Sequence, residues 1–304
     1  MCQLRPGLAW AKLTAIVKNM SWLLLTALSV VSRAVYGVMT KVLSDKVIVS
    51  APTQAVLLTT AGAAFAVLAS PFLGGVHLTG VEIDWIVVLL VVLGQGLGNV
   101  VYFASIKHLT NGTAQIAFSS ILVFNTFLSL VFLSLQLSFI NILGIILLLL
   151  AILAVVSGTV EFNKRGVGLM LLAAFLFSVF QVASVELSQQ VTAATYLVIA
   201  YGGSALVVFV LKARQVISDV INTQALKTLL LVPVLTAIPS VGNFLFSYYA
   251  YRLAPEPAKV AILLTSQVVV AVFLSYFLLK EKSHLGRKLG AAAAIIIASL
   301  LIKD

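Results

Sequence analysis

The stretch GNVVYFASIKHLTNGTAQIAFSS, residues 98–120, has a counterpart in GNFLFSYYAYRLAPEPAKVAILL, residues 242–264. Each begins with a Gly-Asn pair inside an apolar segment, so that Asn243 follows Asn99 by 144 positions. Leucine and alanine positions after the pair also coincide without a gap, and in both copies a helix, a tight turn and the next helix follow in the same order. We therefore predict an internal repeat.

The composition places this repeat in a membrane. Hydrophobic residues make up 62% of the 304 residues and charged residues only 9%. Apolar runs of about 18 residues or more can cross the hydrocarbon core as helices, and the absence of water there requires helical backbone. The runs predict ten spans, near 21–41, 50–70, 85–106, 112–134, 138–158, 166–187, 193–212, 226–251, 257–280 and 284–302.

The ten spans divide into five and five. We predict an N-terminal basic segment over 1–20, a first five-helix repeat over 21–160 and a second over 161–304. A unit with an odd number of spans enters the membrane from opposite sides in its two copies. The predicted fold class is therefore an all-α integral membrane protein with two inverted five-helix repeats, an architecture typical of secondary transporters that bind substrate near the midplane.

A longer pattern is similar to a known family. The segment LAPEPAKVAILLTSQVVVAVFLSYFLLKEKSHLGRKLGAAAAIII, residues 253–297, has a small-residue turn, an Ala-containing span and a charged turn before Leu-Gly. It resembles the EamA-type ten-span transporters of the drug/metabolite transporter superfamily, in which Lys280-Glu281-Lys282 stands where a Gly-Glu-Arg turn is frequent. Two features depart from that family: proline is absent from SSILVFNTF inside the fourth span and from TSQVVVAVF inside the ninth, and LQLSF at 135–139 has no acidic residue.

Arg33 is the most informative polar residue within a predicted span. It lies ~18 Å along the first helix from about Ser21, at 1.5 Å per residue, which is past the middle of the membrane. An unpaired Arg at the bilayer centre costs about 2.5–3.5 kcal/mol. One interpretation is that its guanidinium grips a carboxylate or phosphate of a substrate. The other is that it reaches the interface, or pairs with backbone carbonyls or with Glu186.

Other polar side chains follow helical spacing, which places them on shared faces. Asn99 and Asn243 are candidates for substrate contact, with an interhelical hydrogen bond that only fixes packing as the alternative. The predicted substrate-binding residues are Arg33, Asn99, Asn243, Gln95, Tyr36, Tyr102, Gln181, Gln267 and Tyr248.

The sequence offers no catalytic or cofactor pattern. The single cysteine, Cys2, excludes a disulfide framework and a multi-Cys metal site. His77, His108 and His284 fall in or near connections, without a serine or metal-ligand partner. We expect no enzymatic activity, no cofactor and no bound metal.

These observations predict a multi-pass transporter of a small polar organic metabolite, with an amino acid or related carboxylate favoured because of Arg33. The alternatives are an exporter of drugs or lipophilic cations and a non-transporting membrane scaffold or accessory subunit. Expected partners are the substrate and the lipid bilayer, without nucleic acid, for a monomer or homodimer in a bacterial or archaeal inner membrane. Lys and Arg are more frequent opposite the termini, which predicts external termini, whereas the family resemblance implies cytoplasmic ones.

Overall fold

A computed structural model gives the structure of the chain. It describes residues 21–46, 49–77, 83–133, 138–156, 163–223, 226–255, 260, 263–264, 266–281 and 284–303. The predicted basic segment at 1–20 lies outside the described residues, as do residues 256–259 of the turn before the ninth span and residues 134–137 of the first-repeat connection.

The described residues form helices and no strand. In chain order they are α2 (Trp22–Lys46), α3 (Ala51–Ala69), the short η1 (Ser70–Phe72), α4 (Trp85–Ile106), α5 (Asn111–Phe118), α6 (Ile121–Leu133), α7 (Phe139–Val156), α8 (Lys164–Gln190), α9 (Ala193–Val198), the π-helix η2 (Ile199–Gly203), α10 (Ser204–Asn222), α11 (Leu226–Leu253), α13 (Gln267–Leu278) and α14 (Leu285–Lys303).

The prediction of an all-helical membrane protein is confirmed at this level. Seven described helical stretches are long and apolar enough to cross a membrane: Trp22–Lys46, Ala51–Phe72, Trp85–Ile106, Asn111–Phe132, Lys164–Gln190, Ala193–Asn222 and Leu230–Leu253. Two shorter apolar helices, Phe139–Ala154 and Gln267–Leu278, accompany them.

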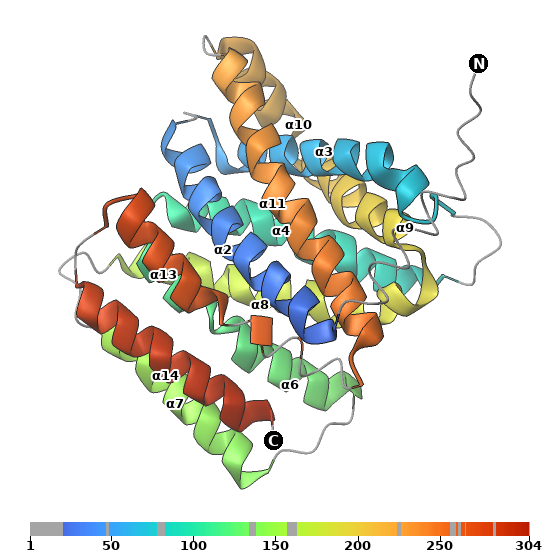
Figure 1. Ribbon diagram of the computed structural model, residues 1–304. Helices are drawn as coiled ribbons and strands as arrows, with labels where there is room; N and C mark the ends of the chain where they lie inside the picture. Colours follow the sequence, from blue (N-terminus) through green and yellow to red (C-terminus); the bar gives the residue numbers. More distant parts are fainter. Residues whose placement is uncertain are drawn as a thin grey trace.

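Helices of the first half of the chain pack against helices of the second half. The most extensive contacts join α4 to α8 and α11 to α2, and α6 packs on α8 as α13 packs on α2. At the periphery α7 lies beside α14, while α3 packs against α10 (Figure 1). Gly94 allows the close approach of α4 to α8, because a Cβ there would lie 2.8 Å from Leu176 O and from Phe180 N.

The fourth and ninth segments are interrupted at residues 119–120 and at residue 266, within stretches that contain no proline. Ser119 and Ser120 separate α5 from α6, and Ser266 precedes α13. Ser119 Oγ donates to Ile116 O at 2.5 Å, and Ser266 Oγ donates to Leu263 O at 2.6 Å. Hydroxyls that bond the preceding turn bend helices, and a serine stands at both interruptions.

The seventh segment differs from the prediction. We predicted that the seventh span ends near residue 212, but α10 continues to Asn222 and changes direction at Lys212 (φ −131°, ψ 23°). Earlier in the same segment, the π-helix η2 includes Tyr201 and the adjacent glycines. Extra backbone in a π-turn shifts the facing of side chains and is frequent at functional sites.

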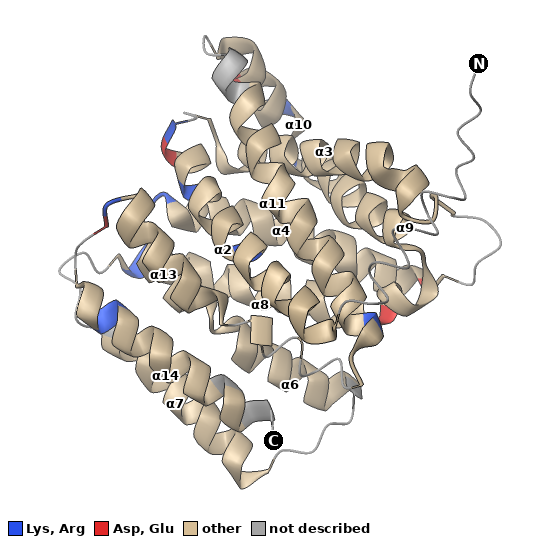
Figure 2. Ribbon diagram, viewed as in Figure 1, with Lys and Arg blue, Asp and Glu red and all other residues tan. Residues whose placement is uncertain are grey.

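Charged side chains lie mainly near helix ends, as Figure 2 shows. Arg33 lies in the middle of α2, and Lys212 and Arg214 lie inside α10, at and just after its change of direction. The bundle interior is built mainly from apolar and small residues, with one large buried cluster that includes residues of α3, α4, α8 and α10, and it also holds buried polar side chains on several helices.

Candidate functional site

A cavity lies between the two halves of the bundle. It is lined by residues of α2, α3, α4, α5, α8, η2, α11 and α13: Arg33, Tyr36, Gly37, Leu58, Gln95, Asn99, Tyr102, Gln115, Phe118, Phe177, Phe180, Gln181, Tyr201, Ser240, Asn243, Phe244 and Gln267. Its volume is about 40 Å³, which is room for a few water molecules. The structure therefore shows a nearly closed state of this cavity.

Eight of the nine predicted site residues line this one cavity: Arg33, Tyr36, Gln95, Asn99, Tyr102, Gln181, Asn243 and Gln267. Tyr248 does not line it. Its ring is 2% exposed and packs between Tyr196 and Tyr249, while its hydroxyl donates to Val191 O at 2.9 Å and accepts from Arg252 Nη1 at 2.8 Å. Tyr248 lies on α11 one turn beyond Phe244, close to the end of the helix.

Arg33 points to neutral partners from the other half of the chain. With the Gln181 amide turned so that its oxygen faces the guanidinium, this oxygen accepts from Nη1 at 3.0 Å and from Nη2 at 3.1 Å. That orientation is required because a guanidinium has only donors, and the amide ends are assigned from such bonds. The Asn125 amide lies 2.7 Å from the Gln181 amide and must turn in the same way, so that its oxygen faces the Gln181 nitrogen. The other end of the Asn125 amide then contacts Ser178 Oγ.

The positive charge of Arg33 is not neutralised by a carboxylate among the residues that the structure describes. Its guanidinium carbon lies 5.6 Å from the centroid of the Phe118 ring, a cation–π contact. The predicted alternative partner, Glu186, is exposed and its Oε1 accepts from Gln190 Nε2 at 3.1 Å, so pairing of Arg33 with Glu186 is excluded in this state.

Both asparagines of the repeated Gly-Asn pair bond to α2. Tyr36 OH donates to Asn99 Oδ1 at 3.2 Å, and Ser29 Oγ donates to Asn243 Oδ1 at 2.8 Å. Asn99 Nδ2 also donates to the backbone oxygen of Gln95 at 3.0 Å. Each amide therefore lines the cavity and at the same time holds a helix contact, which combines the two interpretations drawn from the sequence.

Two glutamines leave acceptors unused at the cavity. Gln95 is 1% exposed and Gln267 is 2% exposed. The Oε1 atom of each is buried and accepts no hydrogen bond within the described part of the chain. A buried acceptor without a partner costs about 1–3 kcal/mol, so a ligand that donates hydrogen bonds would gain by meeting these oxygens.

Aromatic rings form a continuous wall of the cavity. Their centroids are 5.6 Å apart for Tyr102 and Phe118, 5.5 Å for Phe118 and Phe177, and 6.4 Å for Phe177 and Phe180. The series continues through Phe244 to Tyr201 at 5.2 and 5.1 Å. Such a wall can pack against an apolar or aromatic portion of a ligand.

The phenylalanines and Gln115 were missed by the sequence analysis. Phe177 and Phe180 follow i, i+3 spacing on α8, on the same side of the helix as Gln181, but phenylalanine in a membrane span usually faces lipid. Gln115 Nε2 donates to Tyr102 OH at 2.8 Å. Gln115 followed the predicted turn in the sequence, so no helical stripe marked it.

The described residues contain no group of three or more His, Cys, Asp or Glu side chains placed to hold a metal ion. The cavity offers instead a guanidinium, amides, phenols and aromatic rings. These groups bind by charge, hydrogen bonding and stacking.

Comparisons with known proteins agree with this architecture. The family model described as "EamA-like transporter family" matches twice, at residues 20–157 and 164–303. A search of curated proteins found no matching sequence. A solved structure titled "Crystal structure of protein" is 16% identical, with a TM-score of 0.66 over 92% of this chain and 96% of its own. At that identity the likeness concerns the fold alone, whereas the double family match spans most of the chain. The chain belongs to the EamA-like transporter family.

Proposed function

We propose that this membrane transporter carries a small polar organic metabolite by alternating access, with an amino acid or related carboxylate as the favoured substrate. The observation that carries the proposal is Arg33, a guanidinium at a cavity between the two halves, whose described neighbours include no carboxylate. A substrate carboxylate would supply the missing negative charge and accept two parallel hydrogen bonds from the guanidinium.

The unused acceptors favour an amino acid over a simple carboxylate. Gln95 and Gln267 offer buried oxygens at the same cavity as the guanidinium. A protonated amine has three donors and no acceptor, so it complements these oxygens as the carboxylate complements Arg33. The aromatic wall from Tyr102 to Tyr201 would receive the side chain of the substrate.

The arrangement of helices supports a carrier with two inverted repeats. We propose ten spans, with residues 21–160 and 161–304 as the repeats. α4 packs on α8 as α11 packs on α2, and α6 packs on α8 as α13 packs on α2. Matching pairs of this kind are what a two-fold relation between the repeats would produce. Rocking of such units about a site between them would expose the cavity to each side in turn, in a bacterial or archaeal plasma membrane.

The test is counterflow into liposomes that contain the purified protein. Three probes differ only in their charged groups: phenylalanine, 3-phenylpropionate and phenethylamine. We expect uptake of phenylalanine to exceed that of the other two. Arg33→Ala should lower uptake of phenylalanine and of 3-phenylpropionate by about tenfold or more, since one charged hydrogen-bonding partner contributes ~1.5–3 kcal/mol. Arg287→Ala, at an exposed arginine of α14, is the matched control and should transport normally.

The other outcomes identify the alternatives. Unchanged uptake in Arg33→Ala would remove Arg33 from the site. Preference for phenethylamine or for tetraphenylphosphonium would favour an exporter of lipophilic cations, for which the aromatic wall is the supporting feature. Absence of uptake for every probe would favour a scaffold in which the pairs Tyr36–Asn99 and Ser29–Asn243 only hold helices together.

A further inference from the structure

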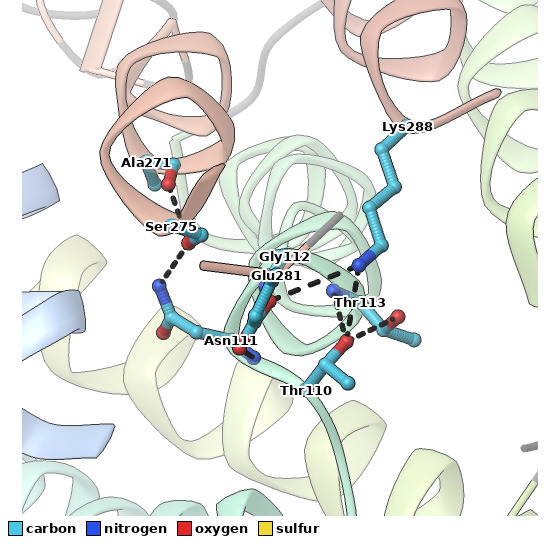
Figure 3. A network of polar contacts seen from close by, with 8 residues as sticks. All are labelled: Thr110, Asn111, Gly112, Thr113, Ala271, Ser275, Glu281 and Lys288. Carbon is cyan, nitrogen blue, oxygen red and sulfur yellow. Dashed lines mark hydrogen bonds and ion pairs between the residues drawn. The ribbon is translucent and has the colours of Figure 1, made fainter. Parts of the chain in front are cut away.

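Glu281 bonds the first turn of a helix that belongs to the other half of the chain. It lies in the turn between α13 and α14. Its Oε1 accepts from Asn111 N at 2.7 Å and its Oε2 accepts from Gly112 N at 3.0 Å (Figure 3). These are the first two backbone N–H groups of α5, which no carbonyl of that helix can satisfy. A carboxylate there is also favoured by the helix dipole.

Further contacts fasten the same junction. Asn111 Nδ2 donates to Ser275 Oγ at 2.7 Å. Lys288 Nζ lies 3.7 Å from Glu281 Oε2 and donates to Thr110 Oγ1 at 3.3 Å (Figure 3). Lys288 is only 2% exposed, and Glu281 is its ion-pair partner. The Glu281 carboxylate therefore joins α5 to α14, and the bond from Asn111 to Ser275 joins α5 to α13.

The turn that holds Glu281 contains non-glycine residues with positive φ angles. Lys280 has φ 56°, in the left-handed region that favours glycine, and His284 has φ 52°. Glu281 N donates to Ser275 O at 3.2 Å and closes the end of α13. Backbone in such regions persists where its surroundings hold it in place, and the bonds to α5 are part of those surroundings.

The clamped helix also lines the cavity. α5 carries Gln115, bonded to Tyr102, and Phe118, which lies under Arg33 and against Tyr102. The interruption at Ser119 and Ser120 separates α5 from α6. Movement at the N-terminus of α5 can therefore reach the cavity without displacing the whole fourth segment.

We propose that Glu281 is a positioning residue that latches α5 in this closed state, and that release of the latch opens the neighbouring end of the pathway. The inference rests on the proposed carrier function, because only a carrier needs that end to open. Glu281 acts through Phe118 and Gln115 and does not itself touch the substrate.

The test measures access of water to a cysteine behind the latch, in protein with Cys2→Ser. Thr40 on α2 is a suitable reporter position, because it is fully buried and follows by one turn Gly37, which packs against Gln115. In Thr40→Cys protein, Glu281→Gln should raise the rate of modification by a hydrophilic thiol reagent about tenfold or more, through loss of charged hydrogen bonds. Glu281→Asp should restore part of the protection.

Two controls separate opening of the latch from general loosening. Asp45→Asn removes an exposed carboxylate that pairs with Lys41, and it should leave the Thr40→Cys rate unchanged. A second reporter is Ser188→Cys, near the C-terminal end of α8 and at the end of the bundle away from Glu281. Ser188 is 1% exposed, and the cysteine there should stay protected in Glu281→Gln protein. Counterflow in the same preparations should show a changed KM for phenylalanine.

The latch is overturned by an unchanged Thr40→Cys rate in Glu281→Gln protein. It is equally overturned if the Thr40→Cys and Ser188→Cys rates rise together, because that pattern is loss of packing throughout. Absence of counterflow in the parent protein would overturn the carrier and leave the accessibility result to be judged separately.

Discussion

The two ends of the bundle are closed by different chemistry. At the end formed by Ser50, Asn111, Asp219 and Glu281, here termed the carboxylate end, two acidic residues of the second half cap helices of the first. Asp219 Oδ2 accepts from Ser50 N at 2.9 Å and from Thr53 Oγ1 at 2.6 Å at the beginning of α3. Glu281 does the same for α5.

The opposite end, formed by Gly75, His77, Thr192 and Thr195 and here termed the threonine end, uses neutral groups. Thr192 Oγ1 donates to Gly75 O at 2.7 Å, and His77 N donates to Thr195 Oγ1 at 2.9 Å. The carboxylate of Asp84 near this end caps its own helix, α4. Over the described residues, therefore, charged caps between the halves lie at the carboxylate end.

This difference shows how the two ends of a bundle built from two repeats can come to be closed with unequal stability. Hydrogen bonds to charged groups contribute about 1.5–3 kcal/mol, roughly twice the contribution of neutral ones. If the two halves are related by a two-fold axis, helix packing alone closes both ends similarly. The caps add stability at one end, and the first-half turn 135–139 has no acidic residue with which to match Glu281.

The largest effect should follow from removing the carboxylate at α5. Glu281→Ala leaves Lys288 buried without its ionic partner, and breaking a buried pair costs about 3–5 kcal/mol. We expect the free energy of unfolding, measured by titration of detergent micelles with SDS, to fall by about 3 kcal/mol. Glu281→Ala combined with Lys288→Met should recover part of the loss, and no recovery would show that the ion pair is unimportant.

A smaller contrast should separate the two ends directly. Asp219→Asn removes a charge from the cap of α3 and should lower the free energy of unfolding by about 2 kcal/mol, whereas Thr192→Val removes neutral bonds and should cost about 1 kcal/mol. The same SDS titration measures both variants. Equal losses would contradict the difference between the ends.

The smallest effect concerns the turn that holds Glu281. Because Lys280 has a left-handed backbone, Lys280→Gly should relieve about 1 kcal/mol of strain, less the entropy that glycine adds to the unfolded chain. We expect a small rise or no change in thermal stability, with the latch intact. A loss of more than about 1 kcal/mol would show that the lysine side chain itself holds the turn.

Much of the site followed from helical spacing. Arg33 and Tyr36 share a face of α2, as do Gln95, Asn99 and Tyr102 of α4, and the structure places all five at one cavity. Local spacing is sufficient there because a regular helix places residues three and four apart on the same face. Tyr248 belongs to no such stripe, and α11 passes the cavity before reaching it.

The remaining features depend on partners far apart in the chain. Glu281 meets Asn111 across 170 positions, and Arg33 meets Gln181 across the repeats. Helix breaks at serine rather than proline, and phenylalanines that face inward, are likewise set by neighbouring helices. No local pattern distinguishes these residues from apolar or turn residues elsewhere.

The sequence by itself determined that the chain is helical, lies in a membrane, contains a doubled unit and places polar residues on particular helix faces. These properties follow from hydropathy and backbone geometry, which act within each segment. Only the tertiary structure decided which faces meet, which groups at the cavity keep unused charge or acceptors, and which end carries the carboxylate caps. Such contacts arise when segments pack, because their energies depend on distances between side chains that the order of residues does not specify.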